Sequence, residues 1–269
     1  MYKKSRAFTL VELVLVILLL GISLVGVTTT IGWGTQVYVD GIDRQRMLEQ
    51  SRFVIERITR ELRSAVPYSV RISTSCIEFV PMIAGSTYTD LAVTPASSNT
   101  ISALHDNNYS FSSGDQILLG LTSTIDVYNP IDNTRIDMNN YTVNESGVID
   151  TATITLSGTT SFAERFEALS NKPNRYYIAN QSVSYCLNFT TNQIRRFTST
   201  ISASQPNLGS ASSTALMAEG IVNTSGATPA VFSFADIEQS TVQIYWQFAS
   251  EINEEPMIYY HQVKVSNAN

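Results

Sequence analysis

The sequence has very few of the side chains on which most catalytic and metal sites depend. Only two histidines and two cysteines occur among its 269 residues, which excludes a disulfide-rich scaffold and a four-cysteine zinc site. The G-x-S-x-G, H-E-x-x-H, P-loop and dinucleotide-binding motifs are also missing from the sequence. We therefore expect a protein that is not an enzyme and that binds no cofactor or metal.

Charge is scarce as well, and positive charge is in the minority. Charged residues make up 15% of the chain, with 17 Lys and Arg against 23 Asp and Glu, for a net charge of −6. Nucleic acid is not an expected partner, because proteins that bind it normally present a basic surface. The apolar share of 43% suffices for a buried core, in one large domain or two small ones.

A long apolar run stands at the N-terminus. Twenty residues, from Phe8 to Val27, are almost all apolar, and Glu12 is their only charge. A helix of that length spans the roughly 30 Å hydrocarbon core of a bilayer. The run follows Lys3, Lys4 and Arg6, which by the positive-inside rule keep the N-terminus in the cytoplasm. We expect a single-pass membrane protein whose C-terminal part has crossed the membrane.

A secretory signal peptide is the alternative interpretation of this N-terminus. Such a peptide has an apolar stretch of about 7–15 residues that ends at a small-residue cleavage site. Here the run continues into Thr28–Trp33 without such a site. A carboxylate within a membrane segment also costs about 2.5 kcal/mol or more, so Glu12 requires an explanation.

The segment KKSRAFTLVELVLVILLLGI resembles the class III signal of type IV pilins and of type II secretion pseudopilins. The resemblance implies that a prepilin peptidase cleaves between Ala7 and Phe8, and that the new amino group of Phe8 is methylated. The family usually has Gly before the cut, where this chain has Ala7. The resemblance also implies that Glu12 pairs with the N-terminal amine of a neighbouring subunit during filament assembly.

We expect four segments along the chain. They are a leader peptide at 1–7, the hydrophobic transmembrane half of a long helix at 8–40, its amphipathic periplasmic half at 41–66, and a β-rich periplasmic domain at 67–269. Pro67 ends the helix, and bends are expected at Gly32, Gly34 and Gly41. The amphipathic half has one apolar stripe at three- and four-residue steps, namely Met47, Ser51, Val54, Ile58, Leu62 and Ala65.

Arginine is abundant on the rest of this amphipathic half. A solvated face and a basic stripe that meets acidic patches on neighbouring subunits are both open interpretations. Arg57 with Glu61, and Glu56 with Arg60, have the four-residue spacing of helical ion pairs. The six arginines are Arg44, Arg46, Arg52, Arg57, Arg60 and Arg63.

Beyond Pro67 short apolar runs alternate with Ser, Thr and Asn, which predicts a strand-rich domain. The fold class is thus α+β, with the long helix packed on a large antiparallel β-sheet domain. Two segments without clear periodicity, Ser86–Asn108 and Ala203–Ala215, are expected to be loops. The expected strands are Val70–Ile72, Ile77–Phe79, Gln116–Leu119, Thr153–Leu156, Arg175–Ala179, Val183–Asn188, Ile194–Phe197, Val231–Phe234, Val242–Phe248 and Met257–Val265.

Cys76 and Cys186 are candidates for a disulfide, because the periplasm is oxidising. Two separate buried thiols are the alternative. His105 reads as a loop residue, and His261 as a packed or surface residue of the final strand. An acidic cluster is best explained by turn residues, with a calcium site as the alternative; it consists of Asp126, Asp132, Asn133 and Asp137.

The order of these features resembles the large minor pilins and pseudopilins of the GspJ and PilW kind, and more closely those of the mannose-sensitive haemagglutinin (MSHA) pilus. The resemblance implies a minor pilin that is built into the filament or primes it. Its partners would be the prepilin peptidase, the major and other minor pilins, and the inner-membrane assembly platform. The alternatives are a minor pseudopilin of type II secretion and an adhesin with aromatic loop residues, for which Tyr88, Tyr109 and Tyr128 are candidates.

Overall fold

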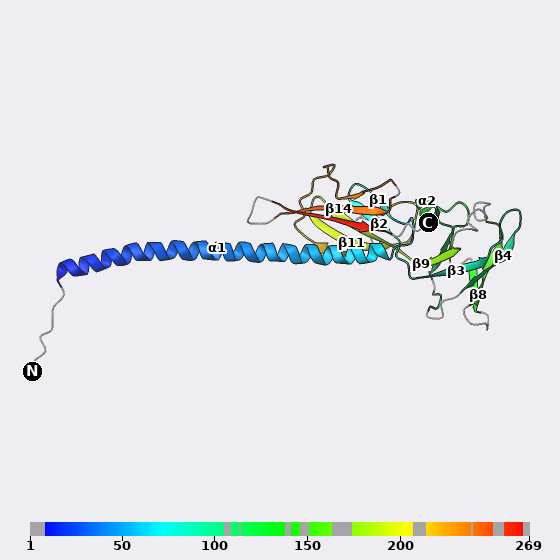
Figure 1. The fold of residues 1–269 in the computed structure, drawn as a ribbon, viewed down its shortest axis with the longest axis horizontal. Coiled ribbons are helices and arrows are strands. Elements are labelled where there is room, and N and C mark those ends of the chain that lie inside the picture. Colours follow the sequence, from blue (N-terminus) through cyan, green and yellow to red (C-terminus); the bar gives the residue numbers. More distant parts are fainter. Residues whose placement is uncertain are drawn as a thin grey trace, which may run out of the picture.

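The computed structural model describes residues 9–104, 109–112, 114–137, 141–145, 151–162, 174–206, 214–237, 239–249 and 256–265. One long helix, α1 (Leu10–Arg63), projects from a β-rich body and ends against it, as Figure 1 shows. All paired strands of that body are antiparallel. The expected α+β class, a long helix packed on antiparallel sheets, is confirmed.

Local hydrogen bonds cap helix α1 at both ends. Thr9 caps its first turn, and its hydroxyl oxygen accepts a bond from the Glu12 amide. At the other end the Ser64 amide donates to the Glu61 and Leu62 carbonyls, and the Val66 amide then donates to Val80. The helix has 54 residues and is about 80 Å long at 1.5 Å per residue.

The bends expected at Gly32, Gly34 and Gly41 do not interrupt this helix. Helix α1 is continuous through all three residues, and Figure 1 shows a gently curved rod. A Cβ added at any of the three would meet no atom within 4 Å, so packing within the chain does not require glycine there. The expectation failed because a glycine lowers helix stability without by itself creating a kink.

The C-terminal part of α1 packs against two sheets, which together we call the proximal module. The helix contacts β12 and β15, an edge strand of each sheet. The five-stranded sheet has the order β1 (Arg71–Ile72), β2 (Cys76–Phe79), β10 (Ser182–Asn188), β11 (Gln193–Ser199), β12 (Thr214–Ala218). The three-stranded sheet has the order β13 (Phe232–Phe234), β14 (Thr241–Phe248), β15 (Met257–Lys264).

The core of the proximal module lies between the helix and these sheets. Ile58 and Leu62 of α1 are fully buried with Phe79, Tyr185 and Trp246 of the sheets. Strand β14 shows the alternation that its sequence predicts, because its second, fourth, sixth and eighth residues are buried and the residues between them are half-buried.

A seven-stranded sheet, the distal sheet, lies beyond the end of α1, at the far end of the body in Figure 1. Its own core includes Tyr88, Ile101, Ile154 and Ile178. A smaller apolar cluster around Val66, Leu118 and Ile201 includes Val127 and Tyr128 of the short helix α2 (Thr124–Tyr128). The strand order is β6 (Arg135–Asp137), β5 (Gln116–Leu119), β9 (Arg175–Ala179), β3 (Ala84–Asp90), β4 (Ser98–Leu104), β8 (Thr151–Thr160), β7 (Tyr141–Glu145).

Each of the ten expected strands overlaps a strand of the structure, but the expected loop at Ser86–Asn108 is wrong. That segment contains most of β3 and all of β4. Only Tyr88, Ile101 and Ala103 of these strands are buried, and Ser, Thr and Asn occupy most other positions, so the apolar alternation is too sparse to read. The expected loop at Ala203–Ala215 extends into β12, and its residues 207–213 lie outside the described part.

Candidate functional site

The first turn of α1 carries the acidic residue that the sequence singled out. Glu12 is the third residue of the helix, and its backbone amide is held by the Thr9 hydroxyl at 3.3 Å and the Thr9 carbonyl at 3.1 Å. Its side chain is exposed. A carboxylate here also interacts favourably with the positive end of the helix dipole.

The N-terminal half of α1 is apolar on all sides and does not pack against the β-rich body. Every described side chain from Leu10 to Val39 is exposed, including Leu10 at 79% and Trp33 at 76%. By length and composition this half can cross a membrane. An apolar helix that the protein itself does not bury requires either lipid or other helices around it.

The threonines of this half satisfy their hydroxyl groups within the helix. Thr28, Thr30 and Thr35 each donate to carbonyls three and four residues earlier, at 2.8–3.2 Å. Such bonds remove the cost of placing a hydroxyl group where no water is present. These side chains are therefore compatible with a hydrocarbon environment.

The C-terminal half of α1 buries the stripe that its sequence predicts. Ser51, Val54, Ile58, Leu62 and Ala65 are all buried, and Met47 packs at the margin of the same core. The two halves of one helix thus have opposite relations to the body. One half belongs to the proximal module, and the other half stands free of it.

A charged cluster fixes α1 on the five-stranded sheet. The Glu61 carboxylate accepts bonds from Arg57 at 3.2 Å, from Arg196 of β11 at 3.1 Å, and from the Tyr185 hydroxyl of β10 at 3.0 Å. Burial, followed by the nearby Glu61 charge, raises the pKa of Tyr185, which therefore stays a neutral donor. Sequence spacing predicted only the Arg57 contact.

Five of the six helix arginines lie on the surface. None of them forms an ion pair with another described residue, and the Glu56–Arg60 pair that the sequence suggested is absent. Both interpretations of the basic face, solvated or partner-facing, remain compatible with this exposure. The five are Arg44, Arg46, Arg52, Arg60 and Arg63.

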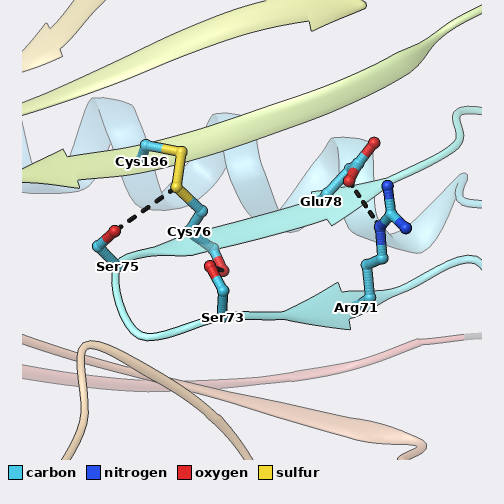
Figure 2. The surroundings of a disulfide bond; sticks show 6 residues. All are labelled: Arg71, Ser73, Ser75, Cys76, Glu78 and Cys186. Carbon is cyan, nitrogen blue, oxygen red and sulfur yellow. Dashed lines mark hydrogen bonds and ion pairs between the residues drawn. A yellow bond between two sulfur atoms is a disulfide. The ribbon is translucent and has the colours of Figure 1, made fainter. Parts of the chain in front are cut away.

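The two cysteines form a disulfide between neighbouring strands. Cys76 of β2 and Cys186 of β10 are direct partners in the register, with Cα atoms 4.1 Å apart, and Figure 2 shows the bond crossing between the strands. Further along β2, the fully buried Glu78 forms an ion pair with Arg71 of β1, at 2.7 Å. The Arg71 guanidinium also lies 3.7 Å from the centre of the Tyr128 ring, which links the sheet to α2.

His261 lies in β15 and faces the helix, where its Nε2 atom is 3.1 Å from the Thr59 hydroxyl. Burial, and then the nearby Arg63, lowers its pKa. His105 falls outside the described residues. The position of His261 is that of a packed residue, because its ring contacts the helix that it helps to hold.

The acidic cluster divides between structural roles. The Asp126 carboxylate accepts bonds from the amides and hydroxyls of Thr122 and Ser123, which caps α2. Among the described residues there is no group of three metal-binding side chains close enough to hold an ion. Asp132 and Asn133 lie in the turn that leads into β6, and Asp137 is the last residue of that strand.

The tyrosines proposed as loop contacts of an adhesin are not exposed. Tyr88 and Tyr128 are 6% and 4% exposed, and the Tyr109 hydroxyl bonds to the Asp115 carboxylate. The Tyr128 hydroxyl donates to the Ser69 carbonyl at 2.6 Å. Tyr88 and Tyr128 belong to local cores, and Tyr109, which lies outside the strands, packs half-buried against the core of the distal sheet.

The comparison with protein families addresses the N-terminal segment. Residues 2–28 match the family model of the prokaryotic N-terminal methylation motif. The chain carries this motif. It indicates a type IV pilin-like or pseudopilin protein, a structural subunit and not an enzyme. No match was found among curated proteins or among solved structures.

The motif includes the residues on which the cleavage expectation depends. Ala7 and Phe8, together with the leader charges Lys3, Lys4 and Arg6, fall within residues 2–28 and outside the described part of the structure. Glu12 lies within the matched segment and also within the described part of the structure. The segment matched by the motif therefore runs directly into the exposed apolar half of α1.

Proposed function

We propose that the protein is a minor pilin that is cleaved between Ala7 and Phe8, is methylated at Phe8, and is either built into a type IV filament or primes its assembly. The observation that carries this proposal is the methylation motif on a helix whose first half is exposed and apolar while its second half is part of a folded module. A cleaved signal peptide needs no such continuous helix.

Before assembly the subunit would reside in the bacterial inner membrane. The leader, with Lys3, Lys4 and Arg6, would lie in the cytoplasm, and the β-rich modules would lie in the periplasm. An oxidising periplasm agrees with the disulfide between Cys76 and Cys186. The partners would be the prepilin peptidase, the major and other minor pilins, and the inner-membrane assembly platform.

Glu12 would set the position of the subunit among its neighbours. It lies four residues after Phe8, at the exposed start of α1, where the amine of a neighbouring subunit could reach it. A buried ion pair is favourable mainly against an unpaired charge, so this contact would define axial register more than it adds stability.

The test compares Glu12→Ala with Glu49→Ala, which removes an exposed carboxylate from the C-terminal half of the same helix. We expect both variants in the membrane fraction, and only Glu49→Ala in the sheared filament fraction at the level of the unmodified protein. Equal incorporation of Glu12→Ala would show that the carboxylate has no role in assembly.

The more specific proposal is a minor pilin of the MSHA type, similar to MshO. It is supported by the order of features, namely an N-terminal motif, an arginine-rich helix and a large β-rich body. Loss of the protein should then abolish surface pili. Loss of protein secretion with intact pili would instead favour a minor pseudopilin of type II secretion.

A further inference from the structure

The uncharged part of α1 is longer than a bilayer requires. No charged residue lies between Glu12 and Asp40, which are 28 positions apart, or about 42 Å along a helix at 1.5 Å per residue. The hydrocarbon core of a bilayer is only roughly 30 Å thick. The apolar run Phe8–Val27 is therefore one of several spans that this helix allows, and the residues that follow the run distinguish between them.

The exposed side chains after Val27 argue against a span that ends there. Helix α1 continues without a break (Figure 1), and among the described residues Asp40 is the first whose side chain is partly buried. The 13 positions between these two residues make about 20 Å of helix that the body does not cover. Ile31, Trp33 and Val37 of this stretch are 60%, 76% and 71% exposed. If the hydrocarbon ended at Val27, these apolar side chains would stand in water, which is unfavourable.

Two aromatic residues indicate a different position for the membrane boundary. Trp33 and Tyr38 are the only tryptophan and tyrosine in the sequence Leu10–Val39, and both side chains are exposed. Such side chains concentrate where hydrocarbon meets headgroups, because this layer accommodates both an apolar ring and a polar N–H or O–H group. Trp33 comes 21 positions after Glu12, or about 32 Å along the helix. A span of bilayer thickness that ends at Trp33 therefore begins at Glu12.

We propose that the unassembled subunit lies in the membrane with Trp33 at the periplasmic boundary of the hydrocarbon and Glu12 at the cytoplasmic boundary, among phospholipid headgroups and water. The 7 positions from Trp33 to Asp40, about 10 Å of helix, then cross the periplasmic headgroup layer, and the body begins outside it. The Glu12 carboxylate avoids the cost of a charge within hydrocarbon while the subunit awaits assembly. This inference rests on the proposed function for the membrane in which the subunit resides.

The test maps thiol accessibility in inner-membrane vesicles of both orientations, from cells that have a prepilin peptidase and lack pilus assembly proteins. Each full-length chain carries one added cysteine, and a membrane-impermeant maleimide labels only thiols that contact water. The native Cys76–Cys186 bond leaves neither of its thiols free, so it adds no background.

The three added cysteines are Val11→Cys, Thr30→Cys and Val37→Cys. We expect labelling of Val11→Cys from the cytoplasmic side, labelling of Val37→Cys from the periplasmic side, and several-fold weaker labelling of Thr30→Cys from either side. A span from Phe8 to Val27 predicts the reverse for residues 11 and 30, because Val11 would then lie inside the hydrocarbon and Thr30 outside it. That result would overturn the proposed position of the helix.

The role of Trp33 is tested by moving the aromatic ring along the helix. Trp33→Leu combined with Thr28→Trp should shift the helix toward the periplasm, so that labelling of Val11→Cys falls several-fold and labelling of Thr30→Cys rises. Trp33→Tyr is the matched control, and it should leave the labelling unchanged. Unchanged labelling in the double variant would overturn anchoring by Trp33.

Removal of the leader is scored in the same cells, which separates this inference from the proposed function. A cleaved leader with Thr30→Cys labelled and Val11→Cys shielded overturns the position of the helix alone. An intact leader in every variant overturns the proposed function.

Discussion

At the residue scale, Glu61 carries the most concentrated set of contacts between the helix and the sheets. Its partners Tyr185 and Arg196 lie 124 and 135 positions away in sequence. Helical spacing could predict Arg57, because that contact is local. It could not predict the other two, because strand order and register decide which polar side chains meet the helix.

Replacing Glu61 by Gln should destabilise the protein by about 1–3 kcal/mol, because Arg57, Arg196 and Tyr185 lose a charged acceptor. Thermal unfolding of the full chain in detergent would measure this as a lower melting temperature. Glu56→Gln is the matched control, since Glu56 is exposed and forms no ion pair with a described residue. Equal melting temperatures for the two variants would contradict the proposed role of the cluster.

His261 should make stability depend on pH in the mildly acidic range. Its pKa is lowered from the ordinary value of 6.5 by burial and then by Arg63, so the unfolded chain takes up the proton more readily. The contribution of His261 is therefore complete above about pH 6.5 and is lost as the pH falls below it. Glu56 and Arg60 line the same pocket between α1 and β15 as His261, and both are unchanged in the variant used for comparison.

The measurement compares melting temperatures of the unmodified protein and His261→Gln between pH 7.5 and 5. We expect the unmodified protein to lose more stability than the variant below pH 6.5, since titration of all other groups is common to both. Parallel curves for the two proteins would show that His261 does not couple folding to protonation.

At the scale of elements, strands with a clear apolar period could be predicted, and strands without one could not. Buried and half-buried side chains alternate over the eight residues of strand β14, so the sequence pattern predicts its buried face. Strands β3 and β4 bury Tyr88, Ile101 and Ala103 among Ser and Thr, and β6 has only three residues. Helix α2 depends on a capping box formed by Ser123 and Asp126, a signal that is present but short.

The pairing of β2 with β10 is reinforced by the disulfide between residues 110 apart in sequence. Replacing both Cys76 and Cys186 by Ser should destabilise the protein by about 4–5 kcal/mol in the chain-entropy model. Thermal unfolding with and without a reductant checks the size, and a thiol count on the denatured, unreduced protein checks the bond. Two free thiols in that count would contradict it.

At the scale of the whole molecule, the division of α1 is the feature that connects sequence to function. Its first half is apolar on all sides and exposed, and its second half is amphipathic and buried along one stripe. Both patterns are local, which is why residues such as Glu12, Ile58 and Leu62 could be placed from sequence alone. The pairing of distant strands, such as β2 with β10, depends instead on contacts between segments far apart in the sequence, which no local pattern indicates.

The most direct test of the central claim is the intact mass of the full chain after co-expression with a prepilin peptidase. We predict loss of Met1–Ala7 and the added mass of one methyl group, located by fragmentation on the amine of Phe8. In cells without the peptidase the leader should remain. Retention of the full leader in the presence of an active peptidase, or cleavage at another position, would contradict the assignment of this chain as a processed pilin-like subunit.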